Sequence, residues 1–179
     1  MAKRKRTNTH RGIEENYNLI PHGKAYKPFI LIQDVPSLGR SSRLRGIKTG
    51  RQHEFLSDLE RNYFMILEFS DFVLDIREQF QLELKETLLI AEDLGIKHPT
   101  HPVTKEPITM TSDFCITQKK GETTEDIIRT TKYKQDLIDR RVIEKFQIEK
   151  TYWQSKGIHW GIVTEDEVDR IYSQNDHHN

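Results

Sequence analysis

The spacing of apolar residues alternates along the chain between a helical and a strand-like pattern, and the order of these patterns constrains the fold most strongly. Between residues 52 and 69, apolar side chains recur at helical spacing, which predicts an amphipathic helix. Strand-like runs then alternate with further helical stretches. The expected strands are 72–77, 111–118, 125–133 and 159–163, and the further helices are 84–94, 135–155 and one that starts after Thr164. This alternation predicts an α/β fold in which helices flank a mixed β-sheet.

Local signals mark where several of these elements end. Gly95 follows the helix at 84–94 and is expected to cap it. The segment 119–122 is expected to turn between two strands, and residues 164–167 have the pattern of a capping box. Further upstream, glycine and proline are frequent between residues 17 and 50, so that region is expected to be an extended loop with one short strand at 29–32.

Charge is distributed unevenly although the formal net charge is zero. Residues 1–51 contain twelve Lys and Arg but only three Asp and Glu, and the remainder of the chain is correspondingly acidic. A basic arm favours a polyphosphate partner, because each neutralised phosphate releases counterions. A solvated tail with ordinary surface charge is the alternative. We expect a disordered basic arm at 1–16, a catalytic domain at 17–172 and a tail at 173–179.

Three charged residues lie within apolar elements and form a candidate site. Glu60 falls on the apolar face of the first helix, where a buried carboxylate usually pairs with a cation. Asp113 lies inside a predicted strand, with its side chain expected on the face opposite Phe114, and Lys132 lies in the next strand. Each residue also has a structural alternative: Glu60 at the edge of its helix and Asp113 facing water.

If the hairpin brings these residues together, their chemistry suits phosphodiester hydrolysis. Two carboxylates can hold Mg²⁺ through oxygen ligands, with a backbone carbonyl and waters completing the shell. A bound metal polarises a phosphate and lowers the pKa of a bound water, while a lysine stabilises developing charge. An acid followed some twenty residues later by a lysine is a weak pattern by itself.

The order of these elements resembles the PD-(D/E)xK, or restriction-endonuclease-like, core: a helix with Glu, a strand with Asp, a strand with Lys and then a helix. Between about residues 22 and 168 the chain resembles the TnsA family more specifically, including Leu56-Ser57-Asp58-Leu59-Glu60 and Leu74-Asp75-Ile76-Arg77-Glu78-Gln79-Phe80. The other similar segments are 22–24, 34–37, 39–41, 48–51, 95–99, 111–114 and 152–154. TnsA is the endonuclease subunit of a heteromeric cut-and-paste DNA transposase.

The resemblance implies a function and a set of residues. Glu60, Asp113 and Lys132 fall on the family's catalytic positions, with Mg²⁺ (Mn²⁺ substituting) as the cofactor. The implied activity is cleavage of double-stranded DNA at the 5′ ends of the transposon, with a TnsB-like transposase and a TnsC-like ATPase regulator as partners. Basic residues expected to contact DNA phosphates are Lys24, Arg40, Arg43, Lys48 and Arg51.

Two departures from the family pattern matter. Two residues before the lysine, the family usually has Gln or Glu as a further metal ligand, whereas this chain has Thr130. We expect Thr130 or the carbonyl of Thr131 to complete the metal site. The alternative is a catalytically impaired scaffold or DNA-binding subunit that keeps the nuclease fold. The family's C-terminal helical domain is also expected to be absent or truncated, since this chain stops at Asn179.

Several other classes are disfavoured by the sequence. The histidines and Cys115 do not have a recognisable zinc-ligand spacing; those considered are His98, His101, His177 and His178. No apolar run approaches the roughly 18 residues that a membrane helix needs. A single cysteine excludes an internal disulfide framework and fits a reducing cytoplasm, so the expected location is cytoplasmic, at the bacterial nucleoid during activity.

Overall fold

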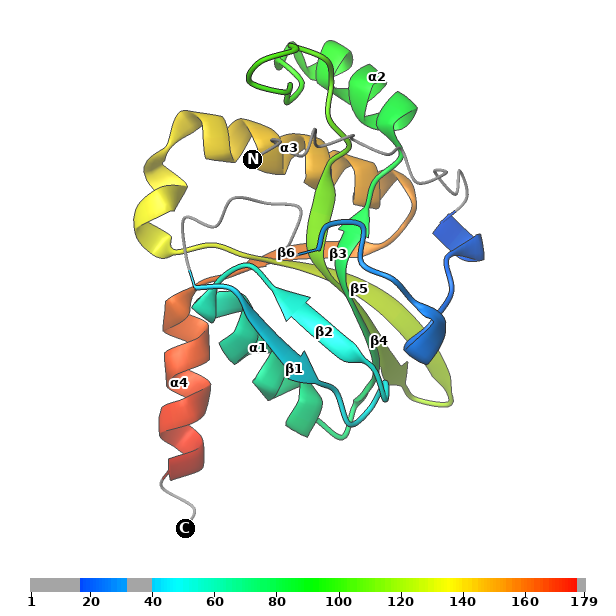
Figure 1. The fold of residues 1–179 in the computed structure, drawn as a ribbon, viewed down its shortest axis with the longest axis vertical. Coiled ribbons are helices and arrows are strands. Elements are labelled where there is room, and N and C mark those ends of the chain that lie inside the picture. Colours follow the sequence, from blue (N-terminus) through cyan, green and yellow to red (C-terminus); the bar gives the residue numbers. More distant parts are fainter. Residues whose placement is uncertain (1–16, 32–39, 177–179) are drawn as a thin grey trace, which may run out of the picture.

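A four-stranded mixed sheet forms the centre of the molecule (Figure 1). The structure is a computed structural model that describes residues 17–31 and 40–176. The sheet has the order β3-β4-β5-β6, and its strands are β3 (Val73–Gln81), β4 (Thr111–Lys120), β5 (Thr123–Thr131) and β6 (His159–Val163). The first three strands are antiparallel neighbours, and β6 is parallel to β5.

Helix α3 (Arg140–Ser155) makes the parallel pairing possible. A parallel neighbour needs a long crossover, because the chain must return to the same end of the sheet. The chain leaves β5, passes through a 3₁₀ segment at Lys134–Ile138 and α3, and then enters β6. The predicted helix at 135–155 is therefore divided, and Asp139 caps its α-helical part through the backbone amides of Arg141 and Val142.

Helices cover both faces of the sheet. On one face, Ile148 and Trp153 of α3 pack with Phe80, Cys115 and Ile128. On the other face, α1 (Asp58–Phe69) packs against the sheet together with β2 (Gln52–Phe55) and α4 (Glu165–Asp176). Helix α2 (Leu84–Leu94) packs beside α3. The predicted α/β class, with a mixed sheet between helices, is confirmed.

The predicted helix at 52–69 is wrong over its first six residues. Residues Gln52–Phe55 form β2, which pairs antiparallel with β1 (Ser42–Arg45). The helix begins only after Ser57, whose hydroxyl accepts a hydrogen bond from the backbone amide of Glu60. Phe55 and Leu56 fit the helical spacing of the apolar residues that follow, which is why the helix was predicted to begin too early. Pairing with β1 makes residues 52–55 a strand instead.

Other local predictions have mixed outcomes. Gly95 adopts a left-handed conformation and caps α2, and Thr164 caps α4 through the carboxylate of Glu167, both as predicted. Of the strand expected at 29–32, the structure describes residues 29–31, and these do not form a strand: residues 29 and 30 form a bend. The arm at 1–16 lies outside the described residues, and α4 continues past Tyr172 into the expected tail. No helix among the described residues is long and apolar enough to cross a membrane.

A buried ion cluster holds the β1–β2 hairpin against the sheet. Glu78 of β3 is fully buried and accepts two hydrogen bonds of 2.8 Å from the guanidinium of Arg51. Its carboxylate also lies 2.6 Å from Nδ1 of His53 in β2. Burial raises the pKa of Glu78, but the bonds from Arg51 and His53 outweigh it and hold that pKa below its ordinary value.

Loss of Arg51 should therefore unfold the protein more easily. In the Arg51→Ala variant, the carboxylate of Glu78 stays buried without its main counterion, so the free energy of unfolding should fall by roughly 3–5 kcal/mol. Arg45→Ala on the same hairpin, at an exposed position, should change it by less than about 0.5 kcal/mol. Urea unfolding at pH 7 measures both variants, and equal stabilities would contradict a structural role for Arg51.

Candidate active site

The first turn of α1 fixes the position of Glu60. Ser57 caps the helix, so Glu60 lies in its first turn with its carboxylate at the helix N-terminus. The Oε2 atom accepts a hydrogen bond of 2.8 Å from the backbone amide of Leu56. Glu60 is buried, with 7% of its surface exposed, which confirms the prediction that its carboxylate lies on the buried side of the helix.

Asp113 lies where β4 and β5 separate. Their ladder pairs residues as far as Phe114 and Arg129, and no pair is formed beyond that point. Instead, Oδ2 of Asp113 accepts hydrogen bonds from the backbone amide of Thr131 at 2.8 Å and from its hydroxyl at 3.0 Å. The side chain of Asp113 therefore links the two strands where their backbones no longer pair.

Lys132 follows the last residue of β5. Its backbone amide donates to the carbonyl of Val163 in β6 at 3.0 Å, which fixes the chain as it leaves the sheet. The positive charge of Lys132 lowers the pKa of Asp113, and the negative charge of Asp113 raises the pKa of Glu60. Gln79 of β3 bonds Glu60 and lies level with Asp113 in the register of β3 and β4, and Asp113 bonds Thr131, the residue before Lys132.

Burial disfavours the charged forms of both Glu60 and Asp113. Desolvation is the main cause that raises the pKa of Glu60 well above its ordinary value, and the charge of Asp113 raises it further. Desolvation also raises the pKa of Asp113, against the hydrogen bonds from Thr131 and the charge of Lys132. A cation bound between the two carboxylates would lower both pKa values and remove this repulsion.

The regular alternation of side chains fails beside Asp113. Phe114 packs with Phe55 and Tyr63 on the α1 side. The Thr130 hydroxyl turns to Glu149 of α3, so its neighbour Thr131 turns to the α1 side, where its hydroxyl bonds Asp113. The expectation that Asp113 lies on the face opposite Phe114 is therefore wrong. Ser112 turns to the other face, where it bonds α3.

Thr130 does not have the role that its position suggested. Its hydroxyl donates to Oε1 of Glu149 in α3, a buried carboxylate that also accepts from Ser112 at 2.6 Å. The neighbouring Thr131 is the residue whose side chain meets Asp113. The Thr130 hydroxyl thus bonds Glu149 rather than Asp113, and its role as a metal ligand stays a prediction.

The oxygen donors nearest a possible cation are few. Within 17–31 and 40–176, no group of three His, Cys, Asp or Glu side chains is placed to hold a metal ion. The Thr131 hydroxyl oxygen lies beside Asp113, whereas Gln79 presents its amide nitrogen to Glu60. Any cation here needs amide, carbonyl or water oxygens as well, which is the ordinary coordination of Mg²⁺ in proteins.

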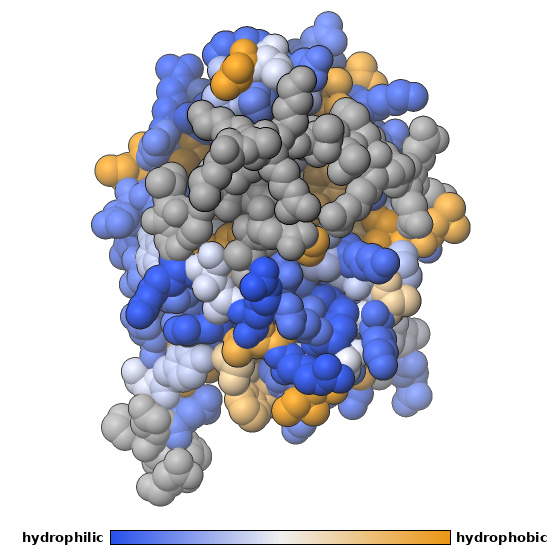
Figure 2. Space-filling view, in the orientation of Figure 1, coloured by the Kyte–Doolittle hydropathy of each residue, from blue (hydrophilic) through white to orange (hydrophobic). Residues whose placement is uncertain are grey.

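The five basic residues expected to contact DNA have unlike environments. Lys24 is exposed, and Arg40, with 85% of its side chain exposed, lies 3.8 Å from Asp58 at the start of α1. Arg43 is half exposed and bonds Glu54. Hydrophilic side chains gather over β1 and β2 on the face seen in Figure 2, consistent with an exposed polar hairpin.

The remaining two basic residues are engaged within the protein. The amine of Lys48 donates to the carbonyl of Ser70, at the C-terminal end of α1, whereas Glu60 lies at its N-terminal end. Arg51 is 8% exposed and bonds Glu78 and the carbonyl of Ile76. A phosphate contact by Arg51 is therefore not supported, because its guanidinium is already buried and paired.

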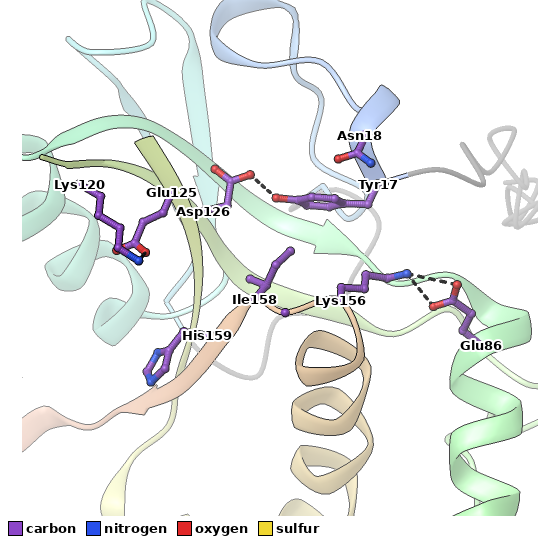
Figure 3. Close-up of a pocket in the computed structure, with 10 residues that line it drawn as sticks. Tyr17, Asn18, Glu86, Lys120, Glu125, Asp126, Lys156, Ile158 and His159 are labelled. Atoms are coloured by element: carbon purple, nitrogen blue, oxygen red, sulfur yellow. Dashed lines mark hydrogen bonds and ion pairs between the residues drawn. The ribbon is translucent and has the colours of Figure 1, made fainter. Parts of the chain in front are cut away.

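A depression elsewhere on the surface is separate from this site (Figure 3). It lies near the start of β5, where Tyr17 donates to Asp126, and none of its lining residues is Glu60, Asp113 or Lys132. Its charged side chains largely pair with each other, as Lys156 does with Glu86 and Lys120 with Glu125. The depression therefore offers little unpaired charge to a phosphate.

Sequence reasoning missed two residues of this region. Gln79 of β3 donates a hydrogen bond of 3.3 Å to Oε2 of Glu60, and Glu149 accepts a hydrogen bond from the hydroxyl of Thr130. Gln79 lies within a segment already similar to the TnsA family, so its position in that segment was the available signal. Glu149 is buried together with Ile148, Tyr152 and Trp153 of α3, which is an unusual environment for an acidic residue.

The chain is similar to known proteins in sequence. Residues 70–165 match the family described as TnsA-like endonuclease N terminal. The chain is also 44% identical over 154 residues to the Transposon Tn7 transposition protein TnsA of Escherichia coli. That alignment covers 86% of this chain and 55% of the relative, so the chain spans about half the length of the curated relative it matches.

Glu149 should make stability depend on pH. Burial raises its pKa to about 7, against hydrogen bonds from Ser112 and Thr130, so the folded protein keeps a proton that the unfolded chain loses near pH 4.5. Stability should therefore fall as pH rises from about 4.5 to 7, by on the order of 3 kcal/mol from this group. Glu149→Gln should remove that part of the pH dependence.

Urea unfolding of both proteins at pH 5 and pH 8 tests this. Other buried carboxylates are common to both proteins, so the difference between their pH dependences isolates Glu149. An equal loss of stability in wild type and Glu149→Gln would show that Glu149 does not carry a raised pKa.

Proposed function

The chain belongs to the TnsA-like endonuclease family, and from this premise we propose that it is a metal-dependent DNA endonuclease of a transposase complex. The proposed reaction is hydrolysis of one strand at the 5′ ends of the transposon during excision. One observation supports the proposal most: Gln79 bonds Glu60 and lies level with Asp113, and Asp113 bonds Thr131, the residue before Lys132.

Each residue has a proposed role that follows from its surroundings. Glu60 and Asp113 bind the cation, because two carboxylates with raised pKa values favour a divalent counterion. The amide and hydroxyl of Thr131 hold Asp113 in place, and the carbonyl of Thr131 is a candidate further ligand. Lys132 stabilises negative charge that develops on the phosphate, or orients the attacking water.

Mg²⁺ is the proposed cofactor, with Mn²⁺ as a substitute. The acidic side chains proposed to hold it, Glu60 and Asp113, offer oxygen ligands, which Mg²⁺ prefers. When bound, the cation supplies Lewis acidity and a bound water of lowered pKa. Glu60 is held by Leu56 and Asp113 by Thr131, so these two ligands are oriented before a cation arrives.

The proposed partners follow from the family. They are double-stranded DNA at the transposon ends, a TnsB-like transposase that cuts and joins the 3′ ends, and a TnsC-like ATPase regulator. The relative from Escherichia coli is described as a transposition protein, which supports an activity within such a complex. Because an isolated subunit can be silent by design, the activity is best assayed with the partner transposase present.

A catalytically impaired scaffold is the second candidate function. The bond from the Thr130 hydroxyl to Glu149 favours it, because the position where the family usually places a ligand contributes no side chain to the site. Divalent metal titration separates the two functions. Binding of Mn²⁺ that requires Asp113 supports the nuclease, and the absence of binding supports the scaffold.

Removal of Asp113 should abolish cleavage. With the partner transposase, Mg²⁺ and a transposon-end duplex, Asp113→Ala should reduce 5′ nicking by at least roughly a hundredfold, because the cation loses a charged ligand. Its binding to the partner should not change. The exposed Asp93→Ala variant of α2 is the matched control and should cleave like wild type. Undiminished nicking by Asp113→Ala would exclude the assignment.

Arg40 should contribute to DNA affinity rather than to stability. It is exposed and lies beside the N-terminal turn of α1 that carries Glu60. If Arg40 contacts a phosphate, Arg40→Ala should lower the slope of log affinity against log salt by about 0.9, with little change in unfolding. The control is Lys85→Ala, an exposed residue of α2. Fluorescence anisotropy over a salt series measures this, and matching slopes would remove Arg40 from the interface.

A further inference from the structure

Gln79 has a backbone conformation that is unusual for its position. It lies inside β3, yet its φ is 47°, in the left-handed region that normally favours glycine. Only 2% of its surface is exposed, so neither solvent nor a flexible loop explains this conformation. A residue in a disfavoured conformation persists only where the surrounding structure imposes it, and such residues gather at functional sites.

Neighbouring segments hold Gln79 in this conformation. Its carbonyl accepts hydrogen bonds from the backbone amide of Phe29 at 3.1 Å and from the hydroxyl of Tyr26 at 3.3 Å. The residues on either side, Glu78 and Phe80, are fully buried. Residues 26–29 therefore fix the strand at this one point.

The conformation changes the face to which Gln79 turns. In a regular strand, successive side chains point to opposite faces. Here Glu78 bonds Arg51 and His53 of the hairpin on the α1 side, and Gln79 reaches Glu60 of α1 itself. A regular β3 would place the Gln79 side chain on the α3 side, so the positive φ is what allows it to meet Glu60.

The side-chain amide of Gln79, in β3, contacts both Glu60 of α1 and Thr111 of β4. Its Nε2 donates to Oε2 of Glu60 at 3.3 Å, and its Oε1 lies 3.5 Å from the hydroxyl of Thr111 in β4. The backbone amide of Leu56 donates to the same Oε2 atom. The register that pairs Glu78 with Phe114 and Phe80 with Ser112 also places Gln79 level with Asp113.

We propose that Gln79 is a positioning residue for the metal site: with Leu56 it fixes Oε2 of Glu60, leaving Oε1 to ligate the divalent cation beside Asp113. This rests on the metal-dependent function proposed above. Gln79 acts through Glu60, whose carboxylate it holds in one orientation. Partners that orient a metal ligand commonly affect metal affinity by roughly tenfold to a hundredfold.

Two substitutions separate this role from a purely structural one. Gln79→Met keeps the length of the side chain but cannot donate to Glu60. Gln79→Gly also removes the donor, but glycine accepts a positive φ without strain, so this variant should fold even if a longer substitute does not. Both variants should unfold thermally near the wild-type temperature.

Isothermal calorimetry with Mn²⁺ on the full chain, without DNA, is the test. We expect both variants to bind Mn²⁺ roughly ten to a hundred times more weakly than wild type, and Asp113→Ala to show no binding. Nicking assays with the partner transposase should then show that saturating Mn²⁺ restores much of the activity of the Gln79 variants but not that of Asp113→Ala.

The outcomes distinguish the two proposals. Wild-type affinity for Mn²⁺ in Gln79→Gly and Gln79→Met would overturn the role of Gln79 while leaving the metal site intact. Tighter binding by Gln79→Glu would also overturn it, because that result indicates a direct ligand rather than a donor to Glu60. No uptake of Mn²⁺ by the wild-type chain would overturn the metal site itself, and the role of Gln79 with it.

Discussion

The contact between Asp113 and Thr131 is the interaction on which the site depends. Backbone pairing between β4 and β5 ends at Phe114 and Arg129, and beyond that point the Asp113 carboxylate joins the strands by accepting from the amide and hydroxyl of Thr131. Residues of other elements lie near this end of the sheet. Glu60 enters from α1, and Lys132 follows Thr131.

The buried carboxylates of this protein fall into two electrostatic groups. Glu78 is buried with Arg51 and His53 around it, and its pKa stays below the ordinary value, as expected for an ion cluster that holds the fold together. Glu60 and Asp113 have raised pKa values because burial is not balanced by enough positive charge. Such imbalance is typical of functional sites, where a ligand completes the charge.

Sequence patterns predicted elements best where local signals were strong. Gly95 after α2 and the capping pattern from Thr164 to Glu167 were both confirmed, since caps depend on residues close in sequence. The β1–β2 hairpin was missed because Phe55 fits a helical spacing, and only pairing with Ser42 makes it a strand. The role of Arg51 was missed for a similar reason: its partner Glu78 is 27 residues away.

Residue spacing and motif order were enough to predict the fold class, the family segments and the candidates Glu60, Asp113 and Lys132, because periodicity and motif order are local properties of a chain. Which neighbours those residues have depends on the packing of distant segments. This packing turned the Thr130 hydroxyl to Glu149 and joined the Asp113 carboxylate to the Thr131 hydroxyl. It also brought Gln79 to Glu60 through a positive φ. Strand separation and a local break in alternation depend on contacts among distant segments, and no spacing of residues encodes them.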